Sequence, residues 1–283
     1  MKQIKFIKSS IKEINLLLEE YLQSLTGGVV DDFKEINPIL EEYLQSLTGV
    51  VDDFWEEHIL MAEIYLIKKE EKVVGCFSIH NKDKITMFYI QHEYVHMAQD
   101  IFKTVLSDFC VQTAFVSTCD LLFLNLCLDF HKKVELQAYF FDGTRAMAVR
   151  EPEYGRELLS EIKPEEIDEI NLKTDNFFSF ASQENYDRIG YKIIRLAENG
   201  IDLGYGIYGP GRLIPRYFYC GMVTIPEYRG KGVGRSIQMH MADMIRESGG
   251  VPVSGCWYYN TLSKKTIESA GRYNSVRLLN VSF

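Results

Sequence analysis

The stretch that decides the fold is Thr224–Ile245, which reads TIPEYRGKGVGRSIQMHMADMI. Its first part gathers glycines and cations into a short turn. Its second part repeats apolar residues at spacings of three and four, the pattern of an amphipathic helix. Residues 218–225, FYCGMVTI, are aromatic and β-branched, as in a buried strand. The order is strand, glycine-rich turn, helix. Free N–H groups and partial positive charge at such a helix start favour a phosphate or pyrophosphate ligand.

Two common phosphate-binding motifs do not fit this stretch. A Walker A loop requires G-x-x-x-x-G-K-[ST], but Ile225 stands in the place of the first glycine and Gly232 follows the lysine. A Rossmann fingerprint requires G-x-G-x-x-G, but Arg235 stands in the place of the last glycine. Ser254 and Gly255 occupy the region where an acidic ribose-binding residue is expected. A dinucleotide is therefore disfavoured.

The remaining pattern is R-x-x-G-x-G, at Arg229, Gly232 and Gly234. Within VTIPEYRGKGVGR it resembles motif A of the GCN5-related N-acetyltransferase (GNAT) family. In that family the turn holds the pyrophosphate of acetyl-CoA. The family also has an Asn after its fifth strand, a small residue three positions later, and a helix that ends in Gly-aromatic. Asn260, Ser263 and the segment 271–273 stand in those places, with one residue inserted before the aromatic.

The resemblance implies a site for acetyl-CoA and no metal. The strand before the turn would offer backbone N–H groups to the thioester carbonyl, where negative charge develops in the transition state. The cofactor-binding residues that it implies are Met222, Val223, Thr224, Arg229, Gly230, Lys231, Gly232, Val233, Gly234, Arg235, Asn260 and Ser263. Lys264 and Lys265 are candidates for the 3′-phosphate of the cofactor, or form a solvated helix face.

The sequence indicates the catalytic residues less clearly than the cofactor-binding residues. The family often has a tyrosine as proton donor seven residues after the Asn, but this chain has Ile267 there. Tyr273 is the nearest substitute, with Tyr259 behind it, and Tyr273 is also explained as the aromatic that packs the helix end. Asn260 is the second catalytic candidate, with helix capping as its alternative role.

Both halves of the chain show one order of elements: hairpin, strand, helix, strand, helix, strand. This predicts an α/β (α+β) fold with two GNAT-like domains, residues 1–145 and 146–283. Each would be a mixed, mostly antiparallel sheet flanked by helices. In the first half the corresponding turn, HEYVHMAQD, has neither glycine nor arginine. The first domain is therefore expected to be a degenerate copy that does not hold pyrophosphate in the family's way.

That same turn matches H-E-x-x-H at His92, Glu93 and His96. On an α-helix two histidines four residues apart can bind zinc beside a glutamate base. Glu135 and His131 are the downstream candidates for a third ligand, but neither lies in a recognisable metalloprotease context. We therefore expect polar residues at a helix start and keep zinc hydrolysis as a minor alternative.

The first sixty residues contain a direct repeat. EINLLLEEYLQSLTGG at residues 13–28 recurs as EINPILEEYLQSLTG at residues 35–49, and VVDDF follows both copies. Two copies are too few for a stacked array, which needs at least three. The repeat therefore predicts a duplicated helical region at the start of the first domain.

Composition restricts the class of protein. The 283 residues carry a net charge of -9, which argues against nucleic acid as a main partner; a cationic substrate and plain solubility both remain compatible. The six cysteines form no C-x-x-C pair and predict buried thiols in a reducing compartment. With no signal peptide or membrane span expected, the prediction is a cytoplasmic protein.

The sequence thus predicts an N-acetyltransferase that moves an acetyl group from acetyl-CoA to an amine of a small molecule. We expect neither nucleic acid nor membrane as a partner, and a homodimer is one assembly that the sequence leaves open. An alternative from another class is a CoA-binding sensor or scaffold that lacks a catalytic acid, as Ile267 would allow.

Overall fold

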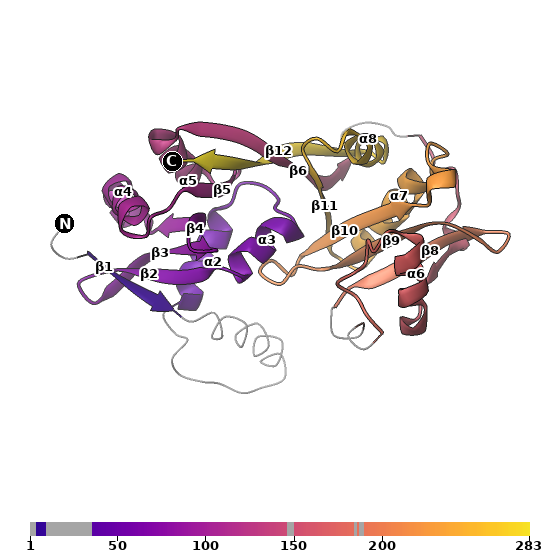
Figure 1. Cartoon of the computed structure of the whole chain (residues 1–283), viewed down its shortest axis with the longest axis horizontal. Coiled ribbons are helices and arrows are strands. Elements are labelled where there is room, and N and C mark those ends of the chain that lie inside the picture. Colours follow the sequence, from indigo (N-terminus) through magenta and orange to yellow (C-terminus); the bar gives the residue numbers. More distant parts are fainter. Residues whose placement is uncertain (1–3, 10–35, 146–149, 184–185, 187–189) are drawn as a thin grey trace. The chain divides into compact units, whose positions relative to one another are not determined.

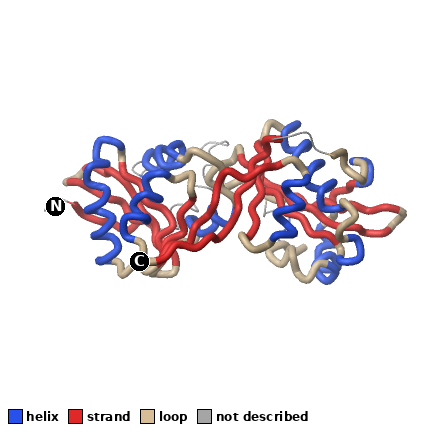
Figure 2. The backbone as a smooth tube through the Cα atoms, turned by 90° about the horizontal axis from the view of Figure 1, so that it is seen from above, coloured by secondary structure: helices blue, strands red, loops and turns tan. Residues whose placement is uncertain are grey.

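The computed structural model describes residues 4–9, 36–145, 150–183, 186 and 190–283. Its contacts divide the chain into two compact units. The first unit comprises Met1–Ala138 and Val276–Phe283, and the second comprises Tyr139–Ser275. Each unit is a sheet with helices packed against it (Figures 1 and 2).

From residue 62 onward the elements follow the order expected from the sequence, with one short strand at residues 159–161 in addition. The chain begins with β1 (Ile4–Ser9), α2 (Ile36–Ser46), α3 (Asp53–Leu60), β2 (Glu63–Lys69), β3 (Lys72–His80), β4 (Lys84–Ile90), the 3₁₀ helix η2 (His92–Met97), α4 (Ala98–Asp108), β5 (Thr113–Ser117), α5 (Leu121–Phe130) and β6 (Lys133–Arg145). It continues with η3 (Arg156–Leu158), β7 (Leu159–Glu161), η4 (Pro164–Glu166), α6 (Ile167–Lys173), β8 (Lys192–Glu198), β9 (Ile201–Pro210), β10 (Tyr217–Thr224), η6 (Pro226–Tyr228), α7 (Val233–Glu247), β11 (Val251–Trp257), α8 (Thr261–Ser269) and β12 (Arg272–Ser282).

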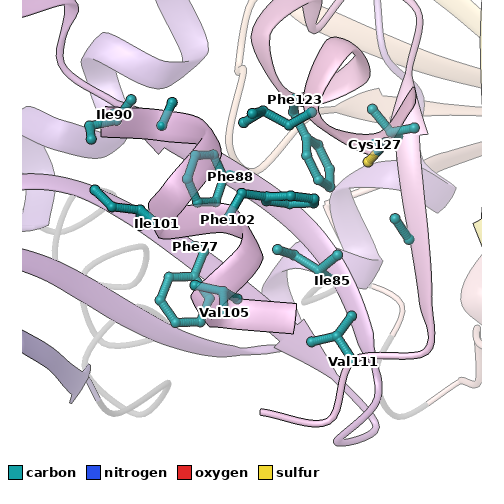
Figure 3. Packing of buried hydrophobic residues seen from close by; sticks show 14 of the residues in the cluster. Phe77, Ile85, Phe88, Ile90, Ile101, Phe102, Val105, Val111, Phe123 and Cys127 are labelled. Atoms are coloured by element: carbon teal, nitrogen blue, oxygen red, sulfur yellow. The ribbon is translucent and has the colours of Figure 1, made fainter. Parts of the chain in front are cut away.

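The sheet of the first unit is mixed and mostly antiparallel, as predicted. Its strands lie in the order β1-β2-β3-β4-β5-β12, and only β4 and β5 run parallel. Helix α4 covers it through Ala98, Ile101, Phe102 and Val105, which all fall on one helix face because of their 3, 4 and 7 spacing. Figure 3 shows Phe102 beside Phe88, whose ring it meets edge to face at 5.2 Å between centroids. This aromatic core fixes α4 to the sheet.

The sheet of the second unit has the order β11-β10-β9-β8-β7, with only β10 and β11 parallel. Helix α7 covers one face through the apolar stripe expected from the sequence, with Val233, Ile237, Met241 and Ile245 buried against β8 and β9. Helix α6 belongs to a second apolar cluster, which includes Tyr205 of β9. The second sheet is therefore packed by apolar side chains from both of these helices.

The structure differs from the sequence predictions at the N-terminal end. Residues 4–9, expected to be part of a helical region, form β1 and pair antiparallel with β2. The second copy of the repeat forms α2, and the Asp52 side chain of the following VVDDF accepts from Trp55 N and caps α3. The first copy lies outside the described residues.

The C-terminal strand also departs from the expected organisation. Residues 276–283 group with the first unit, whereas the sequence assigned them to a domain of residues 146–283. The cause is antiparallel pairing of β12 with β5, from Leu278 opposite Ser117 to Ser282 opposite Thr113. Among the cysteines, four are buried as predicted and Cys110 is exposed. None of the described helices is long and apolar enough to cross a membrane.

A buried acid caps α5 in the first unit. The Asp120 carboxylate accepts hydrogen bonds from Phe123 N at 3.2 Å and from the Tyr43 hydroxyl at 3.0 Å. Burial raises the pKa of Asp120 from its usual 3.8 to about 7, although both hydrogen bonds favour the ionised form. The folded chain therefore binds a proton here at pH values at which the unfolded chain has lost it.

The raised pKa of Asp120 predicts that the stability of the protein depends on pH. Between about pH 4 and pH 7 the native state binds more protons than the unfolded state, so the unfolding free energy falls as pH rises. Asp120→Asn keeps an oxygen to cap α5 but cannot ionise, so its first unit should lose less stability across this window. Urea unfolding at several pH values, followed by hydrogen exchange of first-unit peptides, measures the slope. Asp129→Asn, at an exposed acid of α5, is the control; equal slopes for both variants would contradict the prediction.

Candidate functional site

The turn between β10 and α7 has a backbone that requires its glycines. The φ angle is +76° at Gly230 and +84° at Gly232, a left-handed region that residues with a side chain rarely adopt. Gly234 is needed for a different reason. A Cβ there would lie 3.0 Å from both Met222 Sδ and Thr266 Cγ2, so glycine allows α7 to begin close to the end of β10.

Helix α7 begins without a side-chain cap. In contrast, α3, α5 and α8 are capped by the side chains of Asp52, Asp120 and Asn260. The first N–H groups of any helix lack an intrahelical acceptor and carry part of the positive end of the helix dipole. At α7 these groups belong to residues 232–235, all of which line a cavity. An external anion can therefore take the place of the missing cap.

This cavity lies within the second unit and has a volume of about 760 Å³. It contains most of the cofactor-binding residues predicted from the sequence: Met222, Val223, Thr224, Arg229, Gly230, Gly232, Val233, Gly234, Arg235, Asn260 and Ser263. Lys231 is not part of the lining; its ammonium nitrogen lies 5.1 Å from the centre of the Tyr228 ring. The structure thus brings the turn, the end of β10 and the start of α8 to one cavity.

The cavity exists because β10 and β11 separate. Their parallel pairing covers only Tyr217 to Tyr219 on β10, opposite residues 251–253. Residues 220–224 of β10 and 255–257 of β11 then line the cavity. On its other edge β10 stays paired with β9 as far as Thr224 opposite Gly204. The edge of β10 that faces the cavity can therefore hydrogen-bond to an extended ligand.

Arg235, one of the cations near the turn, forms an ion pair with an acid from the segment before β7. The Glu153 carboxylate pairs with the Arg235 guanidinium and lies 3.4 Å from that of Arg150. It also lies against Gly232, where a Cβ would collide with it. Burial, together with the nearby charge of Arg150, lowers the pKa of Arg235 below its usual value. Glu153 thus holds negative charge at the start of α7, which sequence reasoning did not foresee.

The residues at the start of α8 have structural roles. The Asn260 side chain accepts from Ser263 N at 3.1 Å and so caps α8, the alternative role noted from the sequence. Lys264 lies 4.9 Å from the centre of the Tyr139 ring and 3.6 Å from Glu268, whereas Lys265 lines the cavity. Of the two lysines, Lys265 is therefore the one positioned to meet a ligand.

The structure does not bring Tyr273 to the cavity. Its side chain is 45% exposed, and it is absent from the lining of the cavity. Arg272, in the position before it on β12, is only 2% exposed. Residues alternate between the two faces of a strand, so the inserted residue takes the inward position and turns the tyrosine outward. Ile267 is buried with Tyr139 and Phe141 and packs the core where the family has its tyrosine.

The corresponding connection of the first unit, between β4 and α4, differs from this turn. In this unit β4 and β5 are also parallel over a short stretch, Lys84 to Ile85. The connection to α4, however, is a 3₁₀ helix without glycine, from His92 to Met97. A 3₁₀ helix has three residues per turn, so His92 and His96 do not share a face. Within the described residues, no group of three His, Cys, Asp or Glu side chains is arranged to hold a metal ion.

Comparison with known protein families gives a match to part of the chain. Residues 32–144 match the family model described as an acetyltransferase (GNAT) domain. The matched segment lies almost entirely in the first unit, not in the unit that carries the glycine-rich turn. A search of curated proteins finds no match.

Solved structures match over nearly the whole chain. A GNAT-family acetyltransferase from Colwellia psychrerythraea has a TM-score of 0.77 at 18% identity, covering 99% of both chains. A GCN5-related N-acetyltransferase from Sphaerobacter thermophilus has a TM-score of 0.55 at 10% identity, covering 99% of this chain and 95% of that one. A tandem GNAT protein from the clavulanic acid biosynthesis pathway has a TM-score of 0.54 at 11% identity, covering 99% and 98%. At these identities the likeness shows the fold alone.

The geometry at α7 predicts that Glu153 competes with external anions. Glu153→Gln removes the charge and releases Arg235, so inorganic pyrophosphate should bind about five- to tenfold more tightly than to the wild type. Isothermal titration calorimetry at low ionic strength measures this affinity. Glu151→Gln removes the same charge two residues away and is the matched control. Equal affinities for the wild type and Glu153→Gln would contradict the competition.

Proposed function

We propose that this chain, a GNAT-type acyltransferase, moves an acetyl group from acetyl-CoA to the amine of a small molecule, with the cofactor bound in the second unit. The observation that carries the proposal is the uncapped start of α7. There two left-handed glycines and Arg229 adjoin a cavity opened by the separation of β10 and β11. A diphosphate supplies the acceptors that these N–H groups lack.

The end of β10 is suited to hold the rest of the cofactor. Residues 222–224 line the cavity while their other backbone edge pairs with β9. A pantetheine arm contains amides and can pair with the open edge as an added strand would. A backbone N–H from Met222, Val223 or Thr224 would then meet the thioester carbonyl. Such a donor stabilises the oxyanion of the transition state more strongly than the neutral carbonyl.

Proton transfer in this reaction requires little help from the side chains of the protein. The attacking amine must be neutral, which a water chain or a carboxylate can achieve. The leaving group is a thiolate, and thiols ionise near pH 8.5, so its departure requires little help from an acid. The exposed position of Tyr273 and the buried Ile267 therefore do not exclude catalysis. We assign no general acid to the described residues, and Asn260 keeps a role in ordering α8 beside the cofactor.

The acceptor side of the cavity favours a small amine. Phe177 and Trp257 contribute aromatic rings to the lining, and Trp257 is 57% exposed. Aromatic faces attract ammonium groups, and the net charge of -9 attracts cations from a distance. The free thiols suit a reducing compartment, which supports a cytoplasmic location.

A single substitution tests the cofactor site. Gly232→Glu places a carboxylate where the diphosphate would lie and should weaken acetyl-CoA binding by at least about a hundredfold, or ~2.7 kcal/mol. Gly249→Glu is the matched control, because it adds the same charge at φ +85° just after the other end of α7, in open space. Calorimetry should give one acetyl-CoA per chain for the wild type and for Gly249→Glu.

Two results would overturn this assignment. Unchanged binding by Gly232→Glu would show that the cofactor lies elsewhere. A stoichiometry of two, falling to one in Gly232→Glu, would show that the first unit also binds acetyl-CoA. Because a Cβ at position 232 would collide with the Glu153 side chain, the substitution should also be made together with Glu153→Ala, which removes the colliding atoms.

A second experiment separates the enzyme from a CoA-binding sensor. Under single-turnover conditions, release of the CoA thiol should depend on added amine and should rise with pH as the amine loses its proton. A thiol reagent detects the product, and a panel of polyamines, amino sugars and aryl amines samples the acceptor. Tight binding of acetyl-CoA without amine-dependent thiol release would favour the sensor.

A further inference from the structure

The cavity of the second unit is lined by residues from both faces of the sheet. Neighbouring residues on a strand point to opposite faces, and on β8 Ile193 belongs to the apolar cluster of α6 whereas Ile194 belongs to that of α7. On β10, Val223 packs against the α6 cluster and Met222 against the α7 cluster, and both line the cavity. The opening between β10 and β11 therefore gives access to both faces.

Two aromatic rings line the cavity on the face that carries α6. Phe177 follows α6, and a Cβ at Gly221 of β10 would lie 3.7 Å from its ring. Trp257 ends β11, and Ser254, three positions before it, has its hydroxyl 3.3 Å from Gln238 of α7. Since Ser254 points towards α7, alternation along the strand turns Trp257 to the opposite face. Both rings therefore lie on the face opposite α7.

Each of these rings is partly exposed and is held by a second ring. Phe177 is 42% exposed and meets the buried Phe178 edge to face, with 4.9 Å between centroids. Trp257 is 57% exposed and meets Tyr259 edge to face at 5.0 Å. Ligand pockets are lined mainly by apolar and aromatic side chains, and a ring already held in place loses little freedom when a ligand binds. The two rings thus offer a preformed apolar surface.

Two glycines leave part of the backbone on this face uncovered. Gly221 of β10 and Gly255 of β11 both line the cavity, and Gly255 shares a strand face with Trp257, two positions later. A flat group can approach a backbone more closely where no Cβ is present. The α6 face of the cavity therefore suits a planar apolar group better than a branched one.

The charged side chains of the lining disfavour an acceptor with several ammonium groups. Among the described residues that line the cavity, five carry charge, and four of them are cations: Arg150, Arg229, Arg235 and Lys265. The fifth, Glu153, already pairs with Arg235 and lies near Arg150. A polyamine or an aminoglycoside would meet repulsion here, because like charges oppose each other in a partly enclosed site. The lining favours a single amine on an otherwise uncharged body.

We propose that the acceptor is an arylalkylamine, a primary amine on a short alkyl chain, whose aromatic ring is held by Phe177 and Trp257. The proposal rests on the proposed function, since acetyl transfer defines what an acceptor is. Contacts between aromatic rings are favourable beyond the burial of their area. With the ring on the α6 face, the alkyl chain extends the amine through the opening between β10 and β11 towards the thioester.

The transfer to such an acceptor needs no further reactant. The neutral amine attacks the carbonyl carbon of the thioester and a C–N bond forms. The C–S bond breaks, and its electron pair leaves with the sulfur of CoA. The nitrogen loses one proton, which the thiolate or solvent takes up. The rings hold the body of the acceptor and not its nitrogen, because an ammonium held on a ring face would stay protonated.

A comparison of amines is the first test. With acetyl-CoA saturating and the CoA thiol detected by a thiol reagent, kcat/KM for 2-phenylethylamine should exceed that for ethylamine, which lacks the ring, about tenfold or more. Spermidine and glucosamine should react no faster than ethylamine. Transfer to spermidine or glucosamine as fast as to 2-phenylethylamine would overturn the aromatic site and leave acetyl transfer in place.

Substitution of the rings is the second test. Phe177→Ala and Trp257→Ala should each raise KM for 2-phenylethylamine about tenfold and bring its kcat/KM closer to that of ethylamine, whereas KM for acetyl-CoA should change far less. Trp257→Phe retains a ring and should keep much of the preference. Phe180→Ala is the matched control, because Phe180 is 50% exposed on the segment of Phe177 and is absent from the lining. An unaltered preference in both alanine variants would contradict the proposal.

Binding without turnover separates this proposal from the proposed function. The chain has two tryptophans, and Trp55 is only 2% exposed, so covering Trp257 with a ring should shift the fluorescence emission to the blue. We expect 2-phenylethylamine to produce this shift in the wild type and not in Trp257→Phe. A shift without thiol release supports the aromatic site and counts against acetyl transfer. Thiol release with neither a shift nor a preference for 2-phenylethylamine supports acetyl transfer and overturns the aromatic site.

Discussion

The cavity of the second unit depends on the point at which β10 and β11 stop pairing. Parallel strands that stayed paired beyond Tyr219 would close the cavity and use the backbone groups of β10 for the sheet. At the next residue, Cys220, the backbone oxygen accepts from the Ser254 hydroxyl at 2.9 Å. The Arg272 guanidinium donates to that hydroxyl and lies 3.9 Å from Cys220 Sγ. A buried polar network at this point competes with further pairing, because a guanidinium must keep its hydrogen-bond partners. The end of the sheet ladder and the floor of the cavity are therefore one feature.

The glycine-rich turn satisfies two requirements that oppose each other. Its left-handed glycines and uncapped helix start leave the first N–H groups of α7 without an intrahelical or side-chain acceptor. The Glu153 carboxylate lies at the same helix start and pairs with Arg235. Under the proposed function, a diphosphate would displace or rearrange the same contact. Its affinity would then depend in part on Glu153, an acid from a segment distant in sequence.

How far the sequence predicts this structure depends on whether a feature is local. The strand, turn and helix around Gly232 were predictable because glycine spacing and helical periodicity act over a few residues. The burial of Arg272 was not predictable. With one residue inserted after Gly271, either Arg272 or Tyr273 could point inward, and only the pairing of β12 decides which of them is buried. Glu153 was missed for a related reason, since nothing in EPEYGREL marks a contact with residues 232–235. The strand β1 was missed because a strand at a sheet edge is defined by the partner that it joins.

The family model matches the first half of the chain, whereas the residues suited to bind the cofactor lie in the second half. The family match spans residues 32–144, where hydrophobic pattern and element order repeat those of a GNAT domain but the turn after β4 is a 3₁₀ helix. The glycine-rich turn lies in the second unit, of which that match covers only residues 139–144. A match over about a hundred residues reflects mainly the buried positions of strands and helices, whereas a diphosphate site needs only a few residues with special backbone angles. The fold can therefore be retained where the site is absent. We therefore propose that in this chain the second unit, with its short glycine-rich turn and split strands, is the half that carries out acyl transfer.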